Sequence, residues 1–313
     1  MLSWSRDAMI REKSVRLMTV IILGSLLAGP RNMVPQTTQQ KQSVPPAAKK
    51  KAASSVKAAA PAAPELEPKA LEILRATASR LAAAHTLSFT AVETFESPSR
   101  QGVPLVFANK YEVTLQRPDK LRVIIEGDGP ASEFYDDGKI AMALAPTENL
   151  VAVTDAPPTI DATLQAIYHR AAIYFPFTDL IVSDPYADLA PGLRHAYYIG
   201  QSIAFGGTTT DMIAYAGDGV FVQMAVGIED RLPRVAHAIY LNDPDRLRHN
   251  LLLSDWQIDA PVSADVFTSS KATSAKHMEF AHPHPEPSSG ARPPLRTPPP
   301  TRPVASSTAP QSN

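Results

Sequence analysis

Histidine side chains near the C-terminal end of the sequence are the first candidates for chemistry, because imidazole is a common metal ligand. His277, His282 and His284 lie close together, with a proline between the last two. A metal site needs more ligands than these, held in a fixed geometry, and a proline-rich tail does not supply them. His237 and His249 are expected on successive strands of one hairpin, yet no third ligand or cysteine accompanies them. We therefore predict structural or surface histidines, and neither a metal nor a cofactor.

Carboxylates and nucleophile motifs are the next candidates. Asp136 and Asp137 form an adjacent carboxylate pair, but Gly138 follows at once, and Asp-Gly is typical of a hairpin turn in which aspartate accepts backbone hydrogen bonds. The sequence contains no G-x-S-x-G, no H-E-x-x-H and no phosphate-binding glycine loop. Gly206 and Gly207 precede three threonines but open no helix, so they are predicted to form a turn. We predict no enzymatic activity; a hydrolase with a dispersed site is an alternative that no motif supports.

The overall charge and the cysteine content exclude further classes of function. Lys and Arg total 30 against 31 Asp and Glu, which leaves a formal net charge of -1. Such a chain has no excess positive potential to attract nucleic acid, so we predict no nucleic-acid partner. The sequence has no cysteine. This excludes disulfides, thiolate metal sites, a cysteine nucleophile and a lipid-modified N-terminal cysteine.

The N-terminal residues 1–29 have the pattern of an export signal. Basic residues precede an apolar run from Leu17 to Leu27; they are Arg6, Arg11, Lys13 and Arg16. The run is too short to span a bilayer comfortably. We predict a signal peptide and a periplasmic or cell-envelope location, without an extended membrane domain. Two alternatives stay open, an uncleaved inner-membrane anchor and a start at Met9 in place of Met1.

Two low-complexity segments flank the part of the chain that we expect to fold. Residues 30–65 are rich in Ala, Pro, Lys and Gln, and residues 281–313 are rich in Pro. Neither segment has enough large apolar side chains to offset the entropy lost on ordering. We therefore predict a disordered tether, a folded domain at residues 66–280 and a disordered tail.

Apolar periodicity predicts the elements of this domain. A helix is predicted from Pro68 to Ala84, because apolar residues recur there at helical spacing. Beyond it the period becomes two, as in the segment Val103–Leu115, where apolar residues alternate with Lys, Glu and Thr. The same alternation occurs at residues 121–125 and 220–228. It is typical of an antiparallel sheet with one polar face.

A helical segment interrupts the strands between Pro157 and Leu193. Thr159 is placed to cap one helix, and a second short helix is predicted after Pro176. About eleven strands remain, with one helix before them and the helical insertion after the sixth. The predicted fold class is α+β, a strongly curved antiparallel sheet or incomplete β-barrel of about eleven strands with covering helices.

Several turn and strand-end motifs occur in the order and spacing of a known family. They are Arg117-Pro118-Asp119-Lys120-Leu121-Arg122, Tyr135-Asp136-Asp137-Gly138-Lys139, Phe175-Pro176-Phe177, Ser183-Asp184-Pro185-Tyr186 and Leu253-Ser254-Asp255-Trp256. On these residues, nearly the whole central domain resembles a family of predicted periplasmic proteins whose fold is similar to that of LolA and LolB, the outer-membrane lipoprotein carrier and receptor. The resemblance implies an incomplete barrel with helices as a lid over an apolar cavity, which in the carriers accepts acyl chains. It does not imply lipoprotein transport, since this sequence has long tails and lacks the receptor's lipidated cysteine.

The alternating strands predict which side chains would line such a cavity. Alternate residues of the strand from Val103 point to one side, as do those of the strand from Val220. Short helices are not expected to fill the concave side of so large a sheet. In the competing arrangement, the strand side chains close the gap themselves. The predicted lining residues are Leu105, Phe107, Tyr111, Val113, Leu115, Phe177, Leu180, Val222, Met224 and Val226.

Two functions from different classes fit this sequence. In the first, the exported domain is a non-enzymatic binder or carrier of a hydrophobic or lipid-like ligand. In the second, the apolar face is filled by its own side chains, and the protein is an envelope interaction or structural module whose tails recruit a protein partner. Trp256 and Arg117, which fall within the shared motifs, are assigned to structure in both.

The apolar run leads to a prediction about export. A reporter fused after Pro64 should appear outside the cytoplasm, and Leu23→Arg should abolish its export because a charge interrupts the apolar run. Fractionation of cells that carry the two fusions measures this. Retention of the unmutated fusion in the cytoplasm would contradict the export signal.

Overall fold

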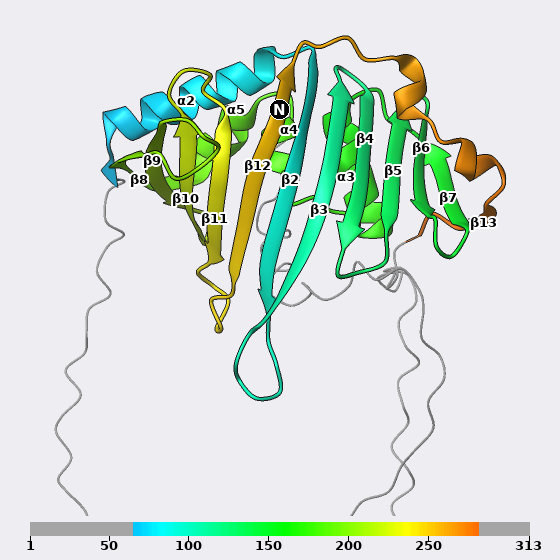
Figure 1. Cartoon of the computed structure of the whole chain (residues 1–313), viewed down its shortest axis with the longest axis horizontal. Coiled ribbons are helices and arrows are strands. Elements are labelled where there is room, and N and C mark those ends of the chain that lie inside the picture. Colours follow the sequence, from blue (N-terminus) through cyan, green and yellow to red (C-terminus); the bar gives the residue numbers. More distant parts are fainter. Residues whose placement is uncertain (1–64, 282–313) are drawn as a thin grey trace, which may run out of the picture.

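The computed structural model describes residues 65–281 as one open, curved sheet with helices against its concave side (Figure 1). The predicted signal, the tether up to residue 64 and the tail from residue 282 lie outside the described residues. Within residues 65–281, no helix is both long and apolar enough to cross a membrane. The predicted α+β class is confirmed.

Thirteen strands make up the sheet, in the order β1-β8-β9-β10-β11-β12-β2-β3-β4-β5-β6-β7-β13. The strands of the first half are β1 (Glu65–Leu66), β2 (Thr86–Ser97), β3 (Leu105–Gln116), β4 (Lys120–Gly127), β5 (Ser132–Asp137), β6 (Ile140–Ala145) and β7 (Leu150–Asp155). The others are β8 (Leu193–Ser202), β9 (Thr210–Gly217), β10 (Val220–Gly227), β11 (Pro233–Tyr240), β12 (Arg248–Ile258) and β13 (Lys276–Met278).

The predicted number of about eleven strands is corrected to thirteen. The strands β2 to β12 pair antiparallel throughout, as the alternation indicated. The two additional strands lie at the edges and pair parallel, β1 with β8 and β13 with β7. With 2 and 3 residues, they are too short for an alternating pattern to be recognised.

Four α-helices cover one face of this sheet. They are α2 (Pro68–Ala83), α3 (Ile160–Ala171), α4 (Thr178–Ile181) and α5 (Pro185–Leu189), with 3-10 turns at Ala190–Gly192, Ala264–Phe267 and Ser270–Thr273. Pro68 occupies the first turn of α2 and lacks the amide hydrogen that would be unpaired there. The Thr159 hydroxyl accepts a hydrogen bond from the Ala162 amide at 3.2 Å, which confirms the predicted cap of α3.

The concave side holds two apolar clusters. The α3-side cluster lies over β2 to β6 and includes Leu164 and Ile167 of α3 together with Phe175, Phe177 and Ile181. The α2-side cluster joins α2 to strands β8, β9 and β10; its buried members are Ala70, Ile73, Leu74, Leu193, Ala196, Ile213, Met224 and Val226. The helices therefore pack against the two ends of the concave face.

Two residues of the shared motifs fasten these layers, as their structural assignment requires. The Arg117 guanidinium donates a hydrogen bond to the Val182 carbonyl at 3.0 Å, directly after α4. The Trp256 indole donates to the Pro233 carbonyl at 2.9 Å, and its ring stacks on Phe89 with centroids 4.5 Å apart. Arg117 thus anchors the helical cover to the sheet, and Trp256 closes one end of the α3-side cluster.

The Asp136–Asp137 pair forms the predicted hairpin turn between β5 and β6. Asp136 accepts a hydrogen bond from the Gly138 amide at 2.9 Å, and Asp137 accepts one from the Lys139 amide at 2.8 Å. Asp136 is 0% exposed, and its second carboxylate oxygen, Oδ2, lies toward the Thr163 hydroxyl of α3. Neither Asp136 Oδ2 nor the Thr163 hydroxyl oxygen has a hydrogen bond of normal geometry among the described residues. Burial raises the pKa of Asp136 to about 6, and the carboxylates of Asp137 and Asp119 add to this rise.

This raised pKa makes the stability of the domain pH-dependent. The pKa of Asp136 is near 3.8 in the unfolded chain, so the folded state binds this proton more tightly. The protonated carboxyl therefore stabilises the folded state at low pH, and this stabilisation is lost as the pH rises from about 4 through about 6. Asp136→Asn keeps the bond from Gly138 and supplies an amide donor toward Thr163. The substitution should raise the free energy of unfolding near pH 7 by about 1 kcal/mol and flatten its pH dependence.

Urea unfolding between about pH 4.5 and 7.5 measures both effects. Asp245→Asn removes an exposed turn carboxylate and serves as the control that leaves the profile unchanged. An unaltered pH slope in the Asp136→Asn variant would show that this carboxylate is ionised in both states.

A candidate ligand pocket between the helices and the sheet

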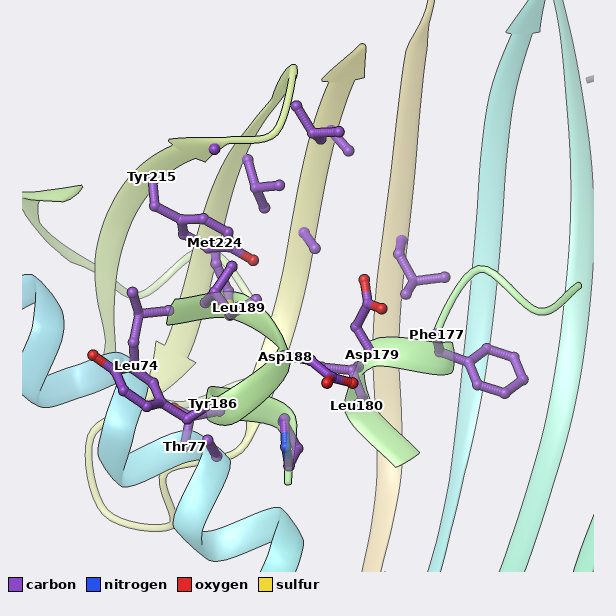
Figure 2. Close-up of a pocket in the computed structure, with 18 of the residues that line it drawn as sticks. Leu74, Thr77, Phe177, Asp179, Leu180, Tyr186, Asp188, Leu189, Tyr215 and Met224 are labelled. Atoms are coloured by element: carbon purple, nitrogen blue, oxygen red, sulfur yellow. The ribbon is translucent and has the colours of Figure 1, made fainter. Parts of the chain in front are cut away.

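A pocket of about 230 Å³ lies between α2, α4 and α5 on one side and β9 to β12 on the other (Figure 2). Its lining residues are Leu74, Thr77, Ala78, Leu81, Tyr174, Pro176, Phe177, Asp179, Leu180, Pro185, Tyr186, Asp188, Leu189, Gly192, Tyr215, Gly217, Asp218, Val220, Val222, Met224, Ala236, Ala238, Tyr240 and Leu251. The pocket therefore occupies the part of the concave face between the two apolar clusters.

Strand register places the sheet side of the pocket on one face. Val222 of β10 lies opposite Ala238 of β11 and Tyr215 of β9, and Met224 lies opposite Ala236. Directly opposed residues of antiparallel strands point to the same side of the sheet. The two alanines are short side chains at the centre of this face, so the space above them is left open.

The α2 wall of the pocket follows from helical periodicity. Leu74, Thr77, Ala78 and Leu81 recur at the spacing that brings side chains to one face of a helix. Thr77 is only 4% exposed, and its hydroxyl has no hydrogen-bond partner within residues 65–281. Figure 2 shows Thr77 beside Tyr186, among the other lining side chains. The wall is thus apolar except for one unsatisfied hydroxyl.

Phe177 separates the pocket from the filled part of the core. Its ring is 1% exposed and meets the rings of Phe89 and Tyr111 edge to face, each at 5.4 Å between centroids. It also stacks on Phe175, with centroids 5.7 Å apart. Because these contacts fix the ring on one side, its other side serves as a rigid end wall of the pocket.

Four tyrosines line the pocket, Tyr174, Tyr186, Tyr215 and Tyr240. Burial raises the pKa values of Tyr174, Tyr215 and Tyr240 above the usual range of a phenol, and the nearby Asp179 carboxylate adds to the rise in each. All three nevertheless keep some accessible surface, and all three line the pocket. Their accessible surface therefore faces the pocket, and their phenols stay protonated at neutral pH.

The charged residues of the lining are all acidic. They are Asp179, which is exposed at the open side, and the half-buried Asp188 and Asp218; the described lining contains no Lys, Arg or His. Glu93 points to the same concave face of the sheet and accepts a hydrogen bond from the Tyr111 hydroxyl at 2.7 Å. Burial raises the pKa of Glu93. The electrostatic character of the pocket is negative.

The predicted lining residues fall into three groups. Phe177, Leu180, Val222 and Met224 line the pocket. Tyr111, Val113 and Leu115 lie on the concave face of β3 as expected, but the structure places them in the α3-side cluster. Val226 is 0% exposed and packs in the α2-side cluster. These four side chains belong to the closed core and do not reach the pocket.

Leu105 and Phe107 lie farther out along β3. Leu105 is 53% exposed, and Phe107 is half-buried and stacks on Phe95 with centroids 5.7 Å apart. Figure 1 shows the reason, since the β2–β3 hairpin extends beyond the edge of the helical layer. Neither residue is among those that line the pocket. The alternation assigned these residues to the correct face of β3, but it does not show where the helical cover ends.

Sequence reasoning missed the polar members of the pocket. Asp179 and Asp188 lie on very short helices, and Asp218 lies in a turn with a positive φ of 48°. Carboxylates in such places are normally solvated, so their types and spacing do not indicate a site. The signal that could have found Asp179 is its position between Phe177 and Leu180, both of which were predicted to line the cavity.

The histidine pair of the β11–β12 hairpin is not brought together. His237 lies opposite Asn250, and their side chains are in contact at 2.8 Å, whereas His249 lies opposite Ala238. The two histidines therefore occupy opposite faces of the sheet. No group of three or more potential metal ligands occurs within the described part of the chain, and His282 and His284 lie outside it.

Comparisons with known proteins give a family and several distant structural similarities. No curated protein matches the chain. The crystal structure of MucB is 13% identical, with a TM-score of 0.36, over 65% of this chain and 64% of that chain. The Pseudomonas aeruginosa MucA/MucB complex is 15% identical, with a TM-score of 0.37, over 65% and 62%. A LolA superfamily protein from Nitrosomonas europaea is 10% identical, with a TM-score of 0.28, over 64% and 97%.

The chain thus spans less than two thirds of the MucB chains that it matches. A family model matches residues 70–281, nearly all of the described sheet and helices. The sequence motifs had indicated a periplasmic family, and the match confirms it. This chain belongs to the family of predicted periplasmic proteins known as DUF2092.

Proposed function

We propose that this periplasmic protein is a non-enzymatic binder or carrier that holds a hydrophobic ligand in the pocket between α2, α4, α5 and β9 to β12. The observation that carries the proposal is the pocket itself, an opening of about 230 Å³ between the helices and the concave face of the sheet. Protein interiors normally contain few voids larger than a water molecule. An apolar opening of this size is therefore a cost to stability that a ligand would offset.

The size of the pocket sets an expected affinity. At roughly 30 Å³ for each methylene, taken as similar to a water molecule, about seven or eight carbons fit. Burial of each would contribute about 0.8 kcal/mol, or about 6 kcal/mol in total. This corresponds to a dissociation constant in the tens of micromolar. Such an affinity suits a protein that must release its ligand again.

The groups on the pocket wall support binding over catalysis. The described lining contains no histidine, serine, cysteine or lysine, and the raised pKa values of Tyr174, Tyr215 and Tyr240 keep these three phenols protonated at neutral pH. Thr77 has a hydroxyl but no base within hydrogen-bond distance to activate it among the described residues. These features support the proposal of a non-enzymatic role.

One observation favours the second candidate function, an envelope interaction module. The end of the β2–β3 hairpin extends from the sheet (Figure 1) and exposes 68% of Val103, 53% of Leu105 and 65% of Val106. Exposed apolar side chains gathered at one end of a sheet are a feature of protein contact sites. In this function the pocket would stay empty, and substitutions in the hairpin would be the ones that weaken binding of the protein partner.

A cavity-filling substitution separates the two functions. Ala238 lies at the centre of the sheet side of the pocket, so Ala238→Phe should place a ring in the open space and change the free energy of unfolding by less than about 1 kcal/mol. The same variant should lose binding of N-phenylnaphthylamine, a neutral apolar dye whose fluorescence rises in apolar surroundings. Fluorescence titration and urea unfolding measure the two effects.

Two control variants complete this experiment. Ala216→Phe adds the same ring to the opposite face of β9 and should bind the dye normally. Val226→Trp enlarges a fully buried side chain of the α2-side cluster and should cost about 1 to 3 kcal/mol through overpacking. If Ala238→Phe destabilises the domain as strongly as Val226→Trp, or if the unmutated protein binds no dye at tens of micromolar, the carrier proposal fails.

A further inference from the structure

We propose that the pocket selects a ligand that joins an apolar body to a positively charged amine, and that it discriminates against fatty-acid anions. This inference rests on the proposed function, because it names the ligand class for the same pocket. The family resemblance implied only a cavity for acyl chains. The present proposal adds a preference for the charge of the head group, which the hydrocarbon part of a ligand does not determine.

The first support is the charge of the lining. Asp179, Asp188 and Asp218 line the pocket, and no basic side chain does so within the described residues. Arg75 lies on the exposed side of α2, with its guanidinium 5.1 Å from the centre of the Tyr186 ring. With one guanidinium and three carboxylates, the formal charge of these groups is negative, whichever local partners Asp188 and Asp218 have. A carboxylate ligand would enter against this potential, and an ammonium ligand would enter with it.

The second support is the presence of tyrosine rings in the pocket that Asp179 also lines. Tyr174, Tyr215 and Tyr240 are lining residues, and the Asp179 carboxylate adds to the rise that burial causes in the pKa values of their phenols. An ammonium group in this pocket would be attracted by the carboxylates and by the faces of the tyrosine rings. Asp179 lies on α4 and Asp188 on the neighbouring helix α5, and Figure 2 labels both among the side chains that line the pocket. The head group is therefore expected at the α4–α5 side, with the apolar body over β10 and β11.

The third support is the Thr77 hydroxyl, an independent sign of a polar ligand group. This side chain is 4% exposed, lines the pocket and has no hydrogen-bond partner within the described residues. A buried hydroxyl without a partner is costly, so a ligand that carries a hydrogen-bond donor would remove this cost. An ammonium is such a donor. Thr77 indicates that the ligand has a polar group, and the three carboxylates determine the sign of its charge.

Three ligands of equal chain length test the proposal on the full chain, purified without detergent. Octylamine, octanol and octanoate present the same apolar body with a positive, neutral and negative head group at about pH 7. Each is titrated as a competitor of N-phenylnaphthylamine. We expect octylamine to displace the dye at concentrations at least about tenfold lower than octanoate, with octanol between them. Added salt should reduce the advantage of octylamine and leave octanol unchanged.

Charge variants assign the preference to the pocket. Asp179→Asn should lower the ratio of octylamine to octanoate affinity about fivefold without changing octanol, and Asp179→Lys should reverse the order of the two charged ligands. Glu72→Gln removes one negative charge from the exposed face of α2, outside the lining, and should leave the ratio unchanged. A ratio that falls equally in the Asp179→Asn and Glu72→Gln variants would overturn the assignment to the pocket.

The outcomes distinguish this inference from the proposed function. If octanol and octanoate displace the dye as well as octylamine does, the charge selectivity is overturned, whereas the proposal of a hydrophobic binder stands. If none of the three competitors displaces the dye and the dye itself does not bind, the proposed function fails, and the inference fails with it. Preference for octylamine that disappears in Asp179→Lys supports both.

Discussion

The Phe177 ring is the contact on which the arrangement of the concave face depends. It meets Phe89 of β2 and Tyr111 of β3 edge to face and stacks on Phe175 two residues earlier in the chain. These rings lie over β2 and β3, at the middle of the strand order of the sheet. The aromatic cluster thereby closes the α3 side of the core and at the same time forms an end wall of the pocket.

The pocket exists because the helices that cover the concave face differ in length. The α2 helix, with 16 residues, and α3, with 12, each bury a continuous apolar face, but α4 and α5 have only 4 and 5 residues. Helices this short cannot bury the strands beneath them completely. At β11 the sheet contributes Ala236 and Ala238, which are too small to fill the remaining space. Short helices above small side chains leave the opening.

Much of this architecture could be predicted from the sequence, because alternation is a direct consequence of strand geometry. It predicted the antiparallel strands and the inward faces of β3 and β10, and helical spacing predicted α2 and α3. It did not predict the short parallel edges or the extent of the cover, so Leu105 and Val226 were assigned to a cavity that neither one lines. Asp179 and Asp188 were missed because a helix of about one turn has no periodicity that shows which side chains face the sheet. Asp218 was missed because it lies in a turn.

The same short helices also determine which part of the cover can move at least cost. The segment after α4 is fastened to the sheet by the Arg117 hydrogen bond to Val182, and α4 itself buries Thr178 and Ile181. By contrast, α5 buries no residue completely, and its N-terminal side-chain cap is the Asp184 carboxylate, which accepts a hydrogen bond from the Ala187 amide at 2.9 Å. Elements with few buried apolar contacts open at low free energy. If the proposed ligand enters past α5, it displaces a helix with no completely buried residue and leaves the Phe177 wall in place.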